Sequence, residues 1–147
     1  MSTDPKPISE TIGYMIARVC TAHHYHASQL MSDIGLYLGQ EMVLQNLWKE
    51  DKLTQSDLAN RIGVQLQTIH KMIWRMEKVG LVTKHADQQD GRVTRVHLTQ
   101  KGRELQTATE DVWDQLEQAT LADLTVEEQY ILRRLLHKLE ENLCKKW

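Results

Sequence analysis

Hydrophobic residues recur at helical spacing over much of the chain. Between Ile8 and Ile34 they fall three or four positions apart, which predicts one long helix with Ser9 able to cap its start. A second helix is expected after Gly35 and Gly39. The buried face of this second helix is predicted to consist of Met42, Val43, Leu44, Leu47 and Trp48. Both helices are too apolar on one side to stand alone, so each must pack against another element.

The middle of the chain has the pattern of two shorter helices joined by a glycine turn. Residues 54–57, TQSD, have the form of a helix N-cap with an acid three positions on, so a short helix should follow. Gly63 supplies the turn, and a second amphipathic helix is predicted from Gln65 to Val79. The positions expected to point inward are Leu58, Ala59, Ile62, Ile69, Met72, Ile73 and Met76. Together these features predict a helix-turn-helix.

A polar hairpin is expected directly after this pair of helices. The segments LVTKH (81–85) and VTRVHLT (93–99) are rich in β-branched residues, and between them lies DQQDGR (87–92). Asp90-Gly91 is a strong turn signal between two such segments. No second hairpin is indicated elsewhere, and the arginine at the exit of the turn, Arg92, requires an explanation.

Two long helices are predicted to complete the chain. The first runs from Gln100 to Thr120, and Thr125 with Glu128 forms a capping box for the second. The apolar stripe of the last helix is Ile131, Leu132, Leu135, Leu136, Leu139 and Leu143. We therefore expect a mainly α fold with a small β-wing, as a single domain over residues 1–147. Long helices in 8–34 and 100–147 flank a winged helix-turn-helix lobe in 38–99.

Charge is distributed unevenly along the chain. The chain of 147 residues is 41% hydrophobic and has a net charge of −2, which by itself argues against a nucleic-acid partner. Residues 52–103, however, hold ten Lys and Arg against four acids, a local charge of +6, whereas the rest carries −8. A cationic centre between acidic arms is typical of a protein that meets phosphates with one face.

No segment has the length and apolarity of a membrane span, and the N-terminus lacks the pattern of a secretory signal. The sequence therefore predicts a cytoplasmic protein.

The second helix of the helix-turn-helix predicts a DNA-binding face. Steps of about 100° per residue place its polar and basic side chains opposite the apolar ones. The outward set is Gln67, His70, Lys71, Trp74, Arg75 and Lys78, and it contains no acid. A major groove admits an α-helix and offers base-edge acceptors beside phosphates, which such side chains suit. A merely solvated surface is the alternative, but the adjoining hairpin and the local positive charge favour DNA.

The order and spacing of several short motifs resemble the MarR family of winged helix-turn-helix transcription regulators. The similar segments are GLYLGQEMVLQNLW (35–48) and the run from Leu53 through Gly102, which contains LANRIGV, VGLV, DGR and LTQKG. The resemblance extends over about residues 8–144. It implies a homodimer held by the terminal helices, with each recognition helix in a major groove of a pseudo-palindrome and each wing reaching a minor groove. Repression is the commoner mode in the family.

The resemblance also implies which residues contact double-stranded DNA. The expected DNA-binding residues are Gln65, Gln67, Thr68, His70, Lys71, Arg75, Asp90 and Arg92. Asp90 is placed to hold the Arg92 side chain by a charge-assisted hydrogen bond. Three positions depart from the family pattern: Gln65 is a poor cap, Gln89 replaces a frequent wing arginine, and Trp74 replaces a small polar or acidic residue. Packing against the hairpin is favoured for Trp74 over contact with DNA.

Family members commonly release DNA when a small aromatic or phenolic molecule binds beside the dimerisation helices. Here His23, Tyr25, His26 and Trp48 are the candidates for lining such a site. The alternative is that these four residues belong to the core.

Metal and redox sensing are the alternatives within the same fold. His23 and His26 share a helical face, but the fifth helix has no histidine to complete a zinc site, so no metal or cofactor is expected. Cys20 lies in an apolar stripe and is predicted to be a buried, unreactive thiol, while Cys144 lies near the end of the last helix.

No motif pairs a nucleophile with a base, so the sequence does not predict an enzyme. A winged-helix protein–protein adaptor is the remaining alternative, because fold alone does not define function. An adaptor would favour exposed apolar residues on the recognition face, where only Trp74 fits.

Overall fold

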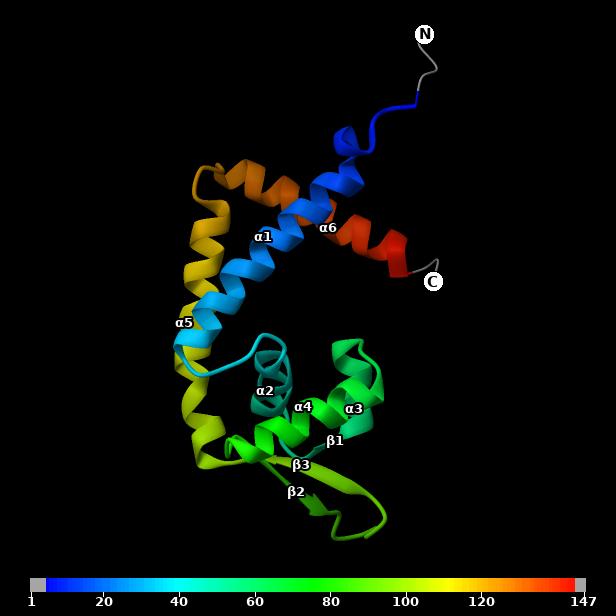
Figure 1. Ribbon diagram of the computed structural model, residues 1–147, viewed down its shortest axis with the longest axis vertical. Coiled ribbons are helices and arrows are strands. Elements are labelled where there is room, and N and C mark those ends of the chain that lie inside the picture. Colours follow the sequence, from blue (N-terminus) through cyan, green and yellow to red (C-terminus); the bar gives the residue numbers. More distant parts are fainter. Residues whose placement is uncertain (1–4, 145–147) are drawn as a thin grey trace. The chain divides into compact units, whose positions relative to one another are not determined.

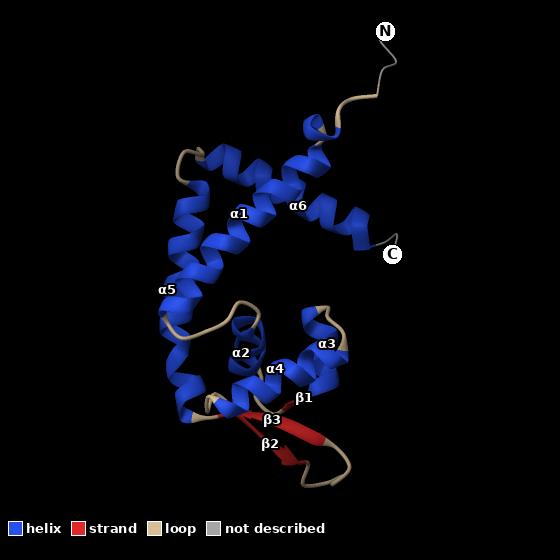
Figure 2. Ribbon diagram, in the orientation of Figure 1, coloured by secondary structure: helices blue, strands red, loops and turns tan. Residues whose placement is uncertain are grey.

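Helices make up most of the protein (Figures 1 and 2). The computed structural model describes residues 5–144. The helical elements are η1 (Ile8–Glu10), α1 (Ile12–Asp33), α2 (Gln40–Lys49), α3 (Gln55–Ile62), α4 (Leu66–Lys78), α5 (Gln100–Leu121) and α6 (Val126–Cys144). The strands are β1 (Leu53–Thr54), β2 (Val82–Ala86) and β3 (Thr94–Leu98). The expected mainly α fold with a small β-wing is confirmed.

The chain divides into two compact units, one ending at Trp113 and the other beginning at Asp114. The first holds η1, α1 to α4, the three strands and the first part of α5, and the second holds the rest of α5 with α6. Within residues 5–144, no helix combines the length and the apolarity that crossing a membrane requires.

Hydroxyl side chains cap three of the helices. Thr54 accepts a hydrogen bond from the Asp57 amide at 3.1 Å while the Asp57 carboxylate accepts one from the Thr54 amide, as the capping-box pattern predicted for α3. Thr125 and Glu128 make the same reciprocal pair at the start of α6. The expectation that Ser9 caps the first helix is wrong. A short 3₁₀ turn precedes α1. Thr11 caps α1 by accepting a hydrogen bond from the Tyr14 amide at 3.2 Å.

Two glycines with positive φ end the two helices of the helix-turn-helix. Gly63 closes α3 in the left-handed region at φ 79°, and Gly80 follows α4 at φ 76°. An added Cβ strains the backbone there, so glycine is the residue that allows both sharp exits. The turn after Gly63 brings α4 against α3, and the exit at Gly80 starts the wing only two residues later, at Val82.

The wing is a three-stranded antiparallel sheet in the order β1-β3-β2. The hairpin β2–β3, which the β-branched segments around Asp90-Gly91 predicted, pairs Val82 with Leu98 and Lys84 with Val96. The third strand was not predicted, because β1 has only two residues and makes one short pairing, Leu53 with Val96. It is nevertheless well placed, since Leu53 is buried in the core and Thr54 caps α3.

One hydrophobic core joins the helix-turn-helix to the wing. It receives the predicted apolar faces of α2 and α4, the inward residues of β3, and single contributions from α1, the following loop and α5. Its fully buried members include Met31, Val43, Leu44, Leu47, Leu58, Ile69, Ile73, Met76, Leu81, Val82 and Val96. The outward face of α4 is therefore held in place from behind by packed side chains.

Asp51 fixes the base of the wing. One carboxylate oxygen accepts from the amides of Lys52 at 2.8 Å and Leu98 at 3.0 Å, and the other accepts from the Arg103 guanidinium at 2.8 Å. The turn after α2, the end of β3 and the first turn of α5 thus share one acceptor.

A second junction forms where α5 begins. The Thr99 hydroxyl lies 2.6 Å from the Gly80 carbonyl oxygen and accepts from the Gly102 amide at 3.1 Å. The Trp48 indole donates to the Gly102 carbonyl at 3.0 Å. Gly102 is tight against its neighbours, because a Cβ at that position would lie 2.3 Å from the backbone oxygen of Leu81. Only glycine fits this crossing without a backbone shift.

Gly102→Ala is expected to destabilise the protein by about 1–3 kcal/mol, because the added methyl group overlaps a backbone atom that cannot rotate away. Urea unfolding followed by circular dichroism measures the change. Gly13→Ala is the matched control in α1, where a Cβ meets nothing within 4 Å and alanine should gain about 0.5–1 kcal/mol. Equal stability changes in the two variants would contradict this packing.

Candidate nucleic-acid interface

The outward face of α4 is exposed as predicted. All six helix residues expected to contact DNA are exposed, while Ile69, Ile73 and Met76 behind them are buried. The exposed set is Gln65, Gln67, Thr68, His70, Lys71 and Arg75. The remaining two predicted residues, Asp90 and Arg92, lie in the wing. The structure therefore groups these six residues along α4 and its N-cap, whereas Asp90 and Arg92 follow later in the chain.

The electrostatics of this face are one-sided. Glu77, the one acid of α4, is half-buried and pairs with Lys84 of β2 at 3.2 Å, so its charge is compensated toward the wing. Gln65 precedes the helix without a side-chain capping bond, as expected for a poor cap. The first amides of α4 are therefore free of a side-chain acceptor, a setting in which a helix N-terminus favours an anion such as phosphate.

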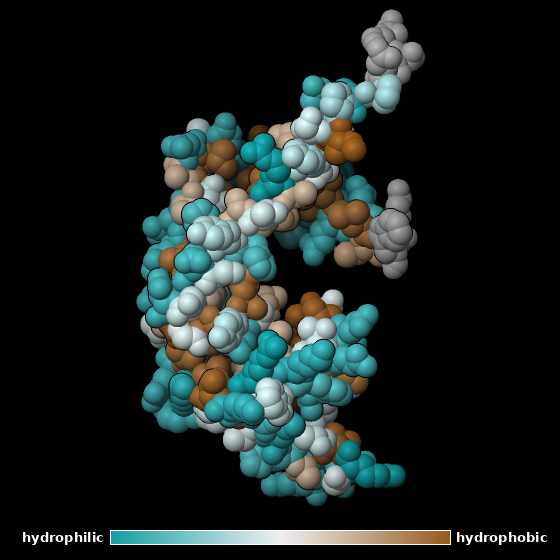
Figure 3. Space-filling view, in the orientation of Figure 1, coloured by the Kyte–Doolittle hydropathy of each residue, from teal (hydrophilic) through white to brown (hydrophobic). Residues whose placement is uncertain are grey.

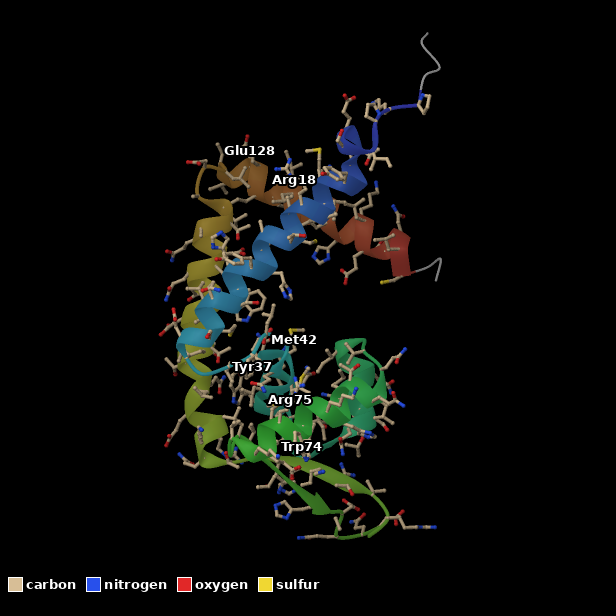
Figure 4. All side chains as sticks on the ribbon, viewed as in Figure 1. Arg18, Tyr37, Met42, Trp74, Arg75 and Glu128 are labelled. Carbon is tan, nitrogen blue, oxygen red and sulfur yellow. The ribbon has the colours of Figure 1, made fainter. Side chains whose placement is uncertain are left out.

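Trp74, labelled in Figure 4, is 53% exposed. The Lys78 ammonium lies 3.7 Å from the centre of its ring. This is a cation–π contact. Trp74, Arg75, His70 and Lys71 together line a shallow hollow of about 370 Å³ on the helix surface.

The tip of the wing holds Arg92 as predicted. The Asp90 carboxylate accepts from the Arg92 backbone amide at 3.1 Å and lies 3.3 Å from its Nε. The Arg92 side chain is 93% exposed, so the guanidinium projects from the tip while its base is restrained. The polar character of the wing is visible at its surface in Figure 3.

Asp87 organises the rest of the wing loop, a role that the sequence did not reveal. Its carboxylate accepts from the amides of Gln89 at 3.2 Å and Asp90 at 3.0 Å and from Arg95 Nε at 2.6 Å. The hydrogen bond from Arg95 is the main reason that the pKa of Asp87 lies below its usual value. Arg95 also donates to the Lys52 carbonyl at 2.9 Å, so its charge is used within the fold.

The outer face of the wing carries a histidine pair. The rings of His85 and His97 are 4.6 Å apart, beside a hollow of about 680 Å³ that Asp87, Arg95 and the turn after α2 also line. Desolvation, with a smaller contribution from His85, lowers the pKa of His97. His85 also lies 2.9 Å from the Thr83 hydroxyl in the same strand. The contact between the two histidine rings joins β2 to β3.

The four residues expected to line an effector site separate into two groups. His23 faces the Trp113 ring at a centroid distance of 6.1 Å, and Trp48 is half-buried with its indole donating to Gly102. Tyr25, 62% exposed, and His26 instead line a hollow of about 550 Å³ along α1. The other residues of this hollow are Tyr14, Ala17, Arg18, Thr21 and Ala22. Figure 4 labels Arg18, the cation of this group, which the sequence reasoning did not select.

Trp113 is a further residue that the sequence reasoning missed. Its Nε1 is buried and has no hydrogen-bond partner among the described residues. Burying an unpaired N–H costs free energy, so this donor is a polar group that a ligand acceptor would satisfy. An outward tryptophan and an inward one cannot be distinguished by spacing alone, which is why the hydrophobic pattern did not reveal it.

Glu41 at the start of α2 is a buried carboxylate, only 2% exposed. It accepts a hydrogen bond from the Gly39 amide at 2.6 Å. Burial raises the pKa of Glu41, and the two backbone hydrogen bonds and the nearby charge of His24 oppose this only in part. A carboxylate at the N-terminus of a helix interacts favourably with the helix dipole, which lowers its pKa. For Glu41 the removal of the carboxylate from water has the larger effect on the pKa.

The expectation that Cys20 is buried is wrong, because both Cys20 and Cys144 are exposed free thiols. Cys20 lies on a part of α1 that the other elements of the first unit do not cover. Across residues 5–144 there is no group of three or more His, Cys, Asp or Glu side chains arranged to hold a metal ion.

Comparison with known proteins agrees with this geometry. Residues 36–94 match the model of the MarR family. The chain is 30% identical over 128 residues to the HTH-type transcriptional repressor Rv2887 of Mycobacterium tuberculosis, covering 87% of this chain and 92% of the relative. It is 29% identical over 130 residues to the HTH-type transcriptional repressor IacR of Pseudomonas putida, covering 88% and 78%.

Solved structures give the same result for the fold. The structure of Bordetella bronchiseptica BpsR, a protein whose DNA binding is regulated by 6-hydroxynicotinic acid, superposes with a TM-score of 0.84 at 26% identity, covering 93% of this chain and 98% of that one. The Streptomyces coelicolor regulator PcaV in complex with its natural ligand superposes with a TM-score of 0.82 at 25% identity, covering 95% and 98%.

A helix-turn-helix combined with a three-stranded wing, with an exposed basic recognition face, defines a winged-helix DNA-binding protein. The chain belongs to the MarR family of transcription regulators. It is a DNA-binding regulator and not an enzyme.

Glu41→Gln is expected to change how stability depends on pH. Because the folded-state pKa is raised above the ordinary value of 4.5, the favourable contribution of the protonated group is fully present below that value and is lost as the pH rises through the raised pKa. Glutamine keeps an oxygen for the Gly39 amide without the charge, so the variant should be more stable than the wild type at neutral pH.

Urea unfolding at a series of pH values measures this difference. Glu117→Gln, at an exposed position of α5, is the control and should give no gain in stability. Parallel pH profiles for the wild type and Glu41→Gln would contradict a destabilising buried carboxylate.

Proposed function

We propose that the protein is a transcriptional repressor that binds a pseudo-palindromic operator as a homodimer and releases it when a small aromatic or phenolic ligand binds. The observation that carries the DNA-binding part is the exposed, acid-free outward face of α4 followed at once by the wing. Side-chain amides at Gln65 and Gln67 suit base edges, while Lys71 and Arg75 suit guanines or phosphates.

The wing supports contact with an adjacent minor groove. Arg92 projects from the tip, and the charges of Arg95 and Lys84 are used in ion pairs with Asp87 and Glu77. A minor groove that is narrow and A·T-rich has enhanced negative potential, which attracts an inserted arginine. We therefore assign most of the wing's contact with DNA to Arg92.

Exposed apolar faces on α1 and α6 support the homodimer. In α1, Ile12, Met15 and Val19 are exposed, and α6 has no buried residue within its own chain. Apolar side chains exposed on α6 include Val126, Tyr130, Ile131, Leu135, Leu136 and Leu143. Figure 3 shows apolar surface over α6. Such extended apolar surface is unfavourable in water, and a second copy of the same helices would cover it.

The hollow along α1 is the site that we propose for the effector. Tyr25 and His26 offer aromatic and polar contacts, and Arg18 offers a cation suited to a carboxylate. Two proteins of this fold are regulated by or bind a small molecule: 6-hydroxynicotinic acid regulates the DNA binding of BpsR, and PcaV forms a complex with its natural ligand. His23 and Trp48 are the alternative lining, with the unpaired Nε1 of Trp113 beside His23.

Lys71→Ala is expected to lower the slope of log affinity against log salt concentration by about one, because it removes one phosphate contact. Arg92→Ala should weaken binding to the operator, by about 1–3 kcal/mol if its guanidinium reads a base edge. A gel-shift titration with the DNA upstream of the gene for this protein, at several salt concentrations, measures both effects.

Lys49→Ala, which removes an exposed lysine at the end of α2, is the control and should leave the slope unchanged. Unchanged binding in both Lys71→Ala and Arg92→Ala would refute the assigned interface. A protein that gives no salt-dependent, sequence-specific shift would be the adaptor considered above, since adaptors do not release counterions from DNA.

The double variant Tyr25→Ala/His26→Ala is expected to abolish stabilisation by the effector. A thermal-shift screen of phenolic and other aromatic acids first identifies a ligand of the wild type, because a ligand that prefers the folded state raises the melting temperature. At a concentration of about 100 times the dissociation constant, that ligand should stabilise the wild type by about 2.7 kcal/mol.

His23→Ala serves as the comparison for the second lining. Loss of the thermal shift in His23→Ala but not in the double variant would place the ligand beside Trp113 instead of in the α1 hollow. A shift produced by a metal ion and by none of the aromatic acids would refute the proposed class of effector.

A further inference from the structure

Trp74 is an unusual side chain for the middle of an exposed recognition face. The residues three and four positions before it, Lys71 and His70, and the next residue, Arg75, surround it on α4. Together with Trp74 they line a hollow of about 370 Å³, so an exposed indole and cationic or hydrogen-bonding side chains lie around one surface depression. An exposed apolar ring among basic side chains fits a partner that presents an apolar group between negative charges.

Lys78 contacts the face of the indole ring. Its ammonium lies 3.7 Å from the ring centre, so the charge and the ring are held together on the last turn of α4. An indole that is 53% exposed keeps a large apolar area in water, which costs free energy until a partner covers it. The lysine held against it adds a further contact for an anion on the same partner.

Double-stranded DNA has the matching chemistry. The C5 methyl group of thymine is the apolar group of the major groove, and the phosphates of both strands border that groove. An apolar peptide would also suit an indole, but it would leave Lys71, Arg75 and Lys78 without negative partners. The positive charge of these three side chains therefore favours DNA over a protein partner.

We propose that Trp74 is a specificity-determining residue that contacts the methyl group of a thymine in each half-site, with Lys78 held on its ring for a backbone phosphate. This inference rests on the proposed function, since it requires α4 to enter a major groove. It assigns a role to the one outward residue of α4 that departs from the family pattern.

The test compares thymine with deoxyuridine, which lacks only the C5 methyl group. The wild-type protein first selects a preferred duplex from a random-sequence library. Each thymine of that duplex is then replaced singly by deoxyuridine, and the dissociation constants are measured for the wild type and Trp74→Ala. Loss of one buried methyl group should weaken wild-type binding about fourfold at one thymine of each half-site.

Trp74→Ala should bind the unmodified duplex more weakly and show no further loss with deoxyuridine at that position. Trp74→Phe should keep the sensitivity, because it keeps an aromatic face without the indole N–H. Val79→Ala removes another exposed apolar side chain, at the end of α4, and should behave as the wild type. Lys78→Met should lower the salt slope by about one without changing the response to deoxyuridine.

Circular dichroism and binding to a random-sequence duplex establish that Trp74→Ala is folded and retains non-specific affinity. An equal deoxyuridine penalty in the wild type and Trp74→Ala, or no penalty at any thymine, would overturn the assignment of Trp74 and leave sequence-specific binding intact. Failure of the library to yield any preferred sequence would overturn the proposed function and this inference together.

Discussion

The structure depends on a close backbone contact where α5 begins. The Cα of Gly102 approaches the Leu81 carbonyl so closely that a Cβ would lie 2.3 Å from the oxygen, and the Trp48 indole donates to the Gly102 carbonyl. Thr99 completes the junction through Gly80 and the Gly102 amide. The end of the recognition helix, the last residue of the wing, α2 and the start of α5 are thus joined within a few residues. A large shift of any of these elements would break one of these hydrogen bonds or create an overlap.

This junction gives a physical route between the proposed effector site and the proposed DNA-binding face. From Gly102 to Trp113, α5 is one uninterrupted helix of about 17 Å at 1.5 Å per residue. Trp113 faces His23 of α1, while Gly102 contacts Leu81 just after α4. Because helices and packed cores transmit displacements rather than absorb them, a ligand that moves α1 against Trp113 is expected to change the position of α4. The coupling therefore depends on packing, not on a flexible linker.

Local patterns in the sequence predicted the elements well, and long-range contacts account for what was missed. Helical spacing and the capping residues around Thr54 and Thr125 act within a few residues, so the helices and the outward face of α4 could be predicted. The strand β1 could not, because two residues carry no periodicity. Cys20 was wrongly predicted to be buried, since an apolar stripe shows which face is covered only after the partner is known.

The wing shows why net charge alone is a poor guide to how a loop meets DNA. The loop looked nearly neutral in sequence, but Asp87 is used by Arg95 and Asp90 restrains Arg92, so the acids shape the loop while one guanidinium projects. A single projecting cation adds little to the non-specific electrostatic affinity, which grows with the number of phosphates neutralised. In the proposed complex, more of the discrimination must then come from α4, whose exposed face carries amides, cations and an indole. The restrained wing and the unusual Trp74 are consistent with a proposed interface in which specificity is concentrated on the recognition helix.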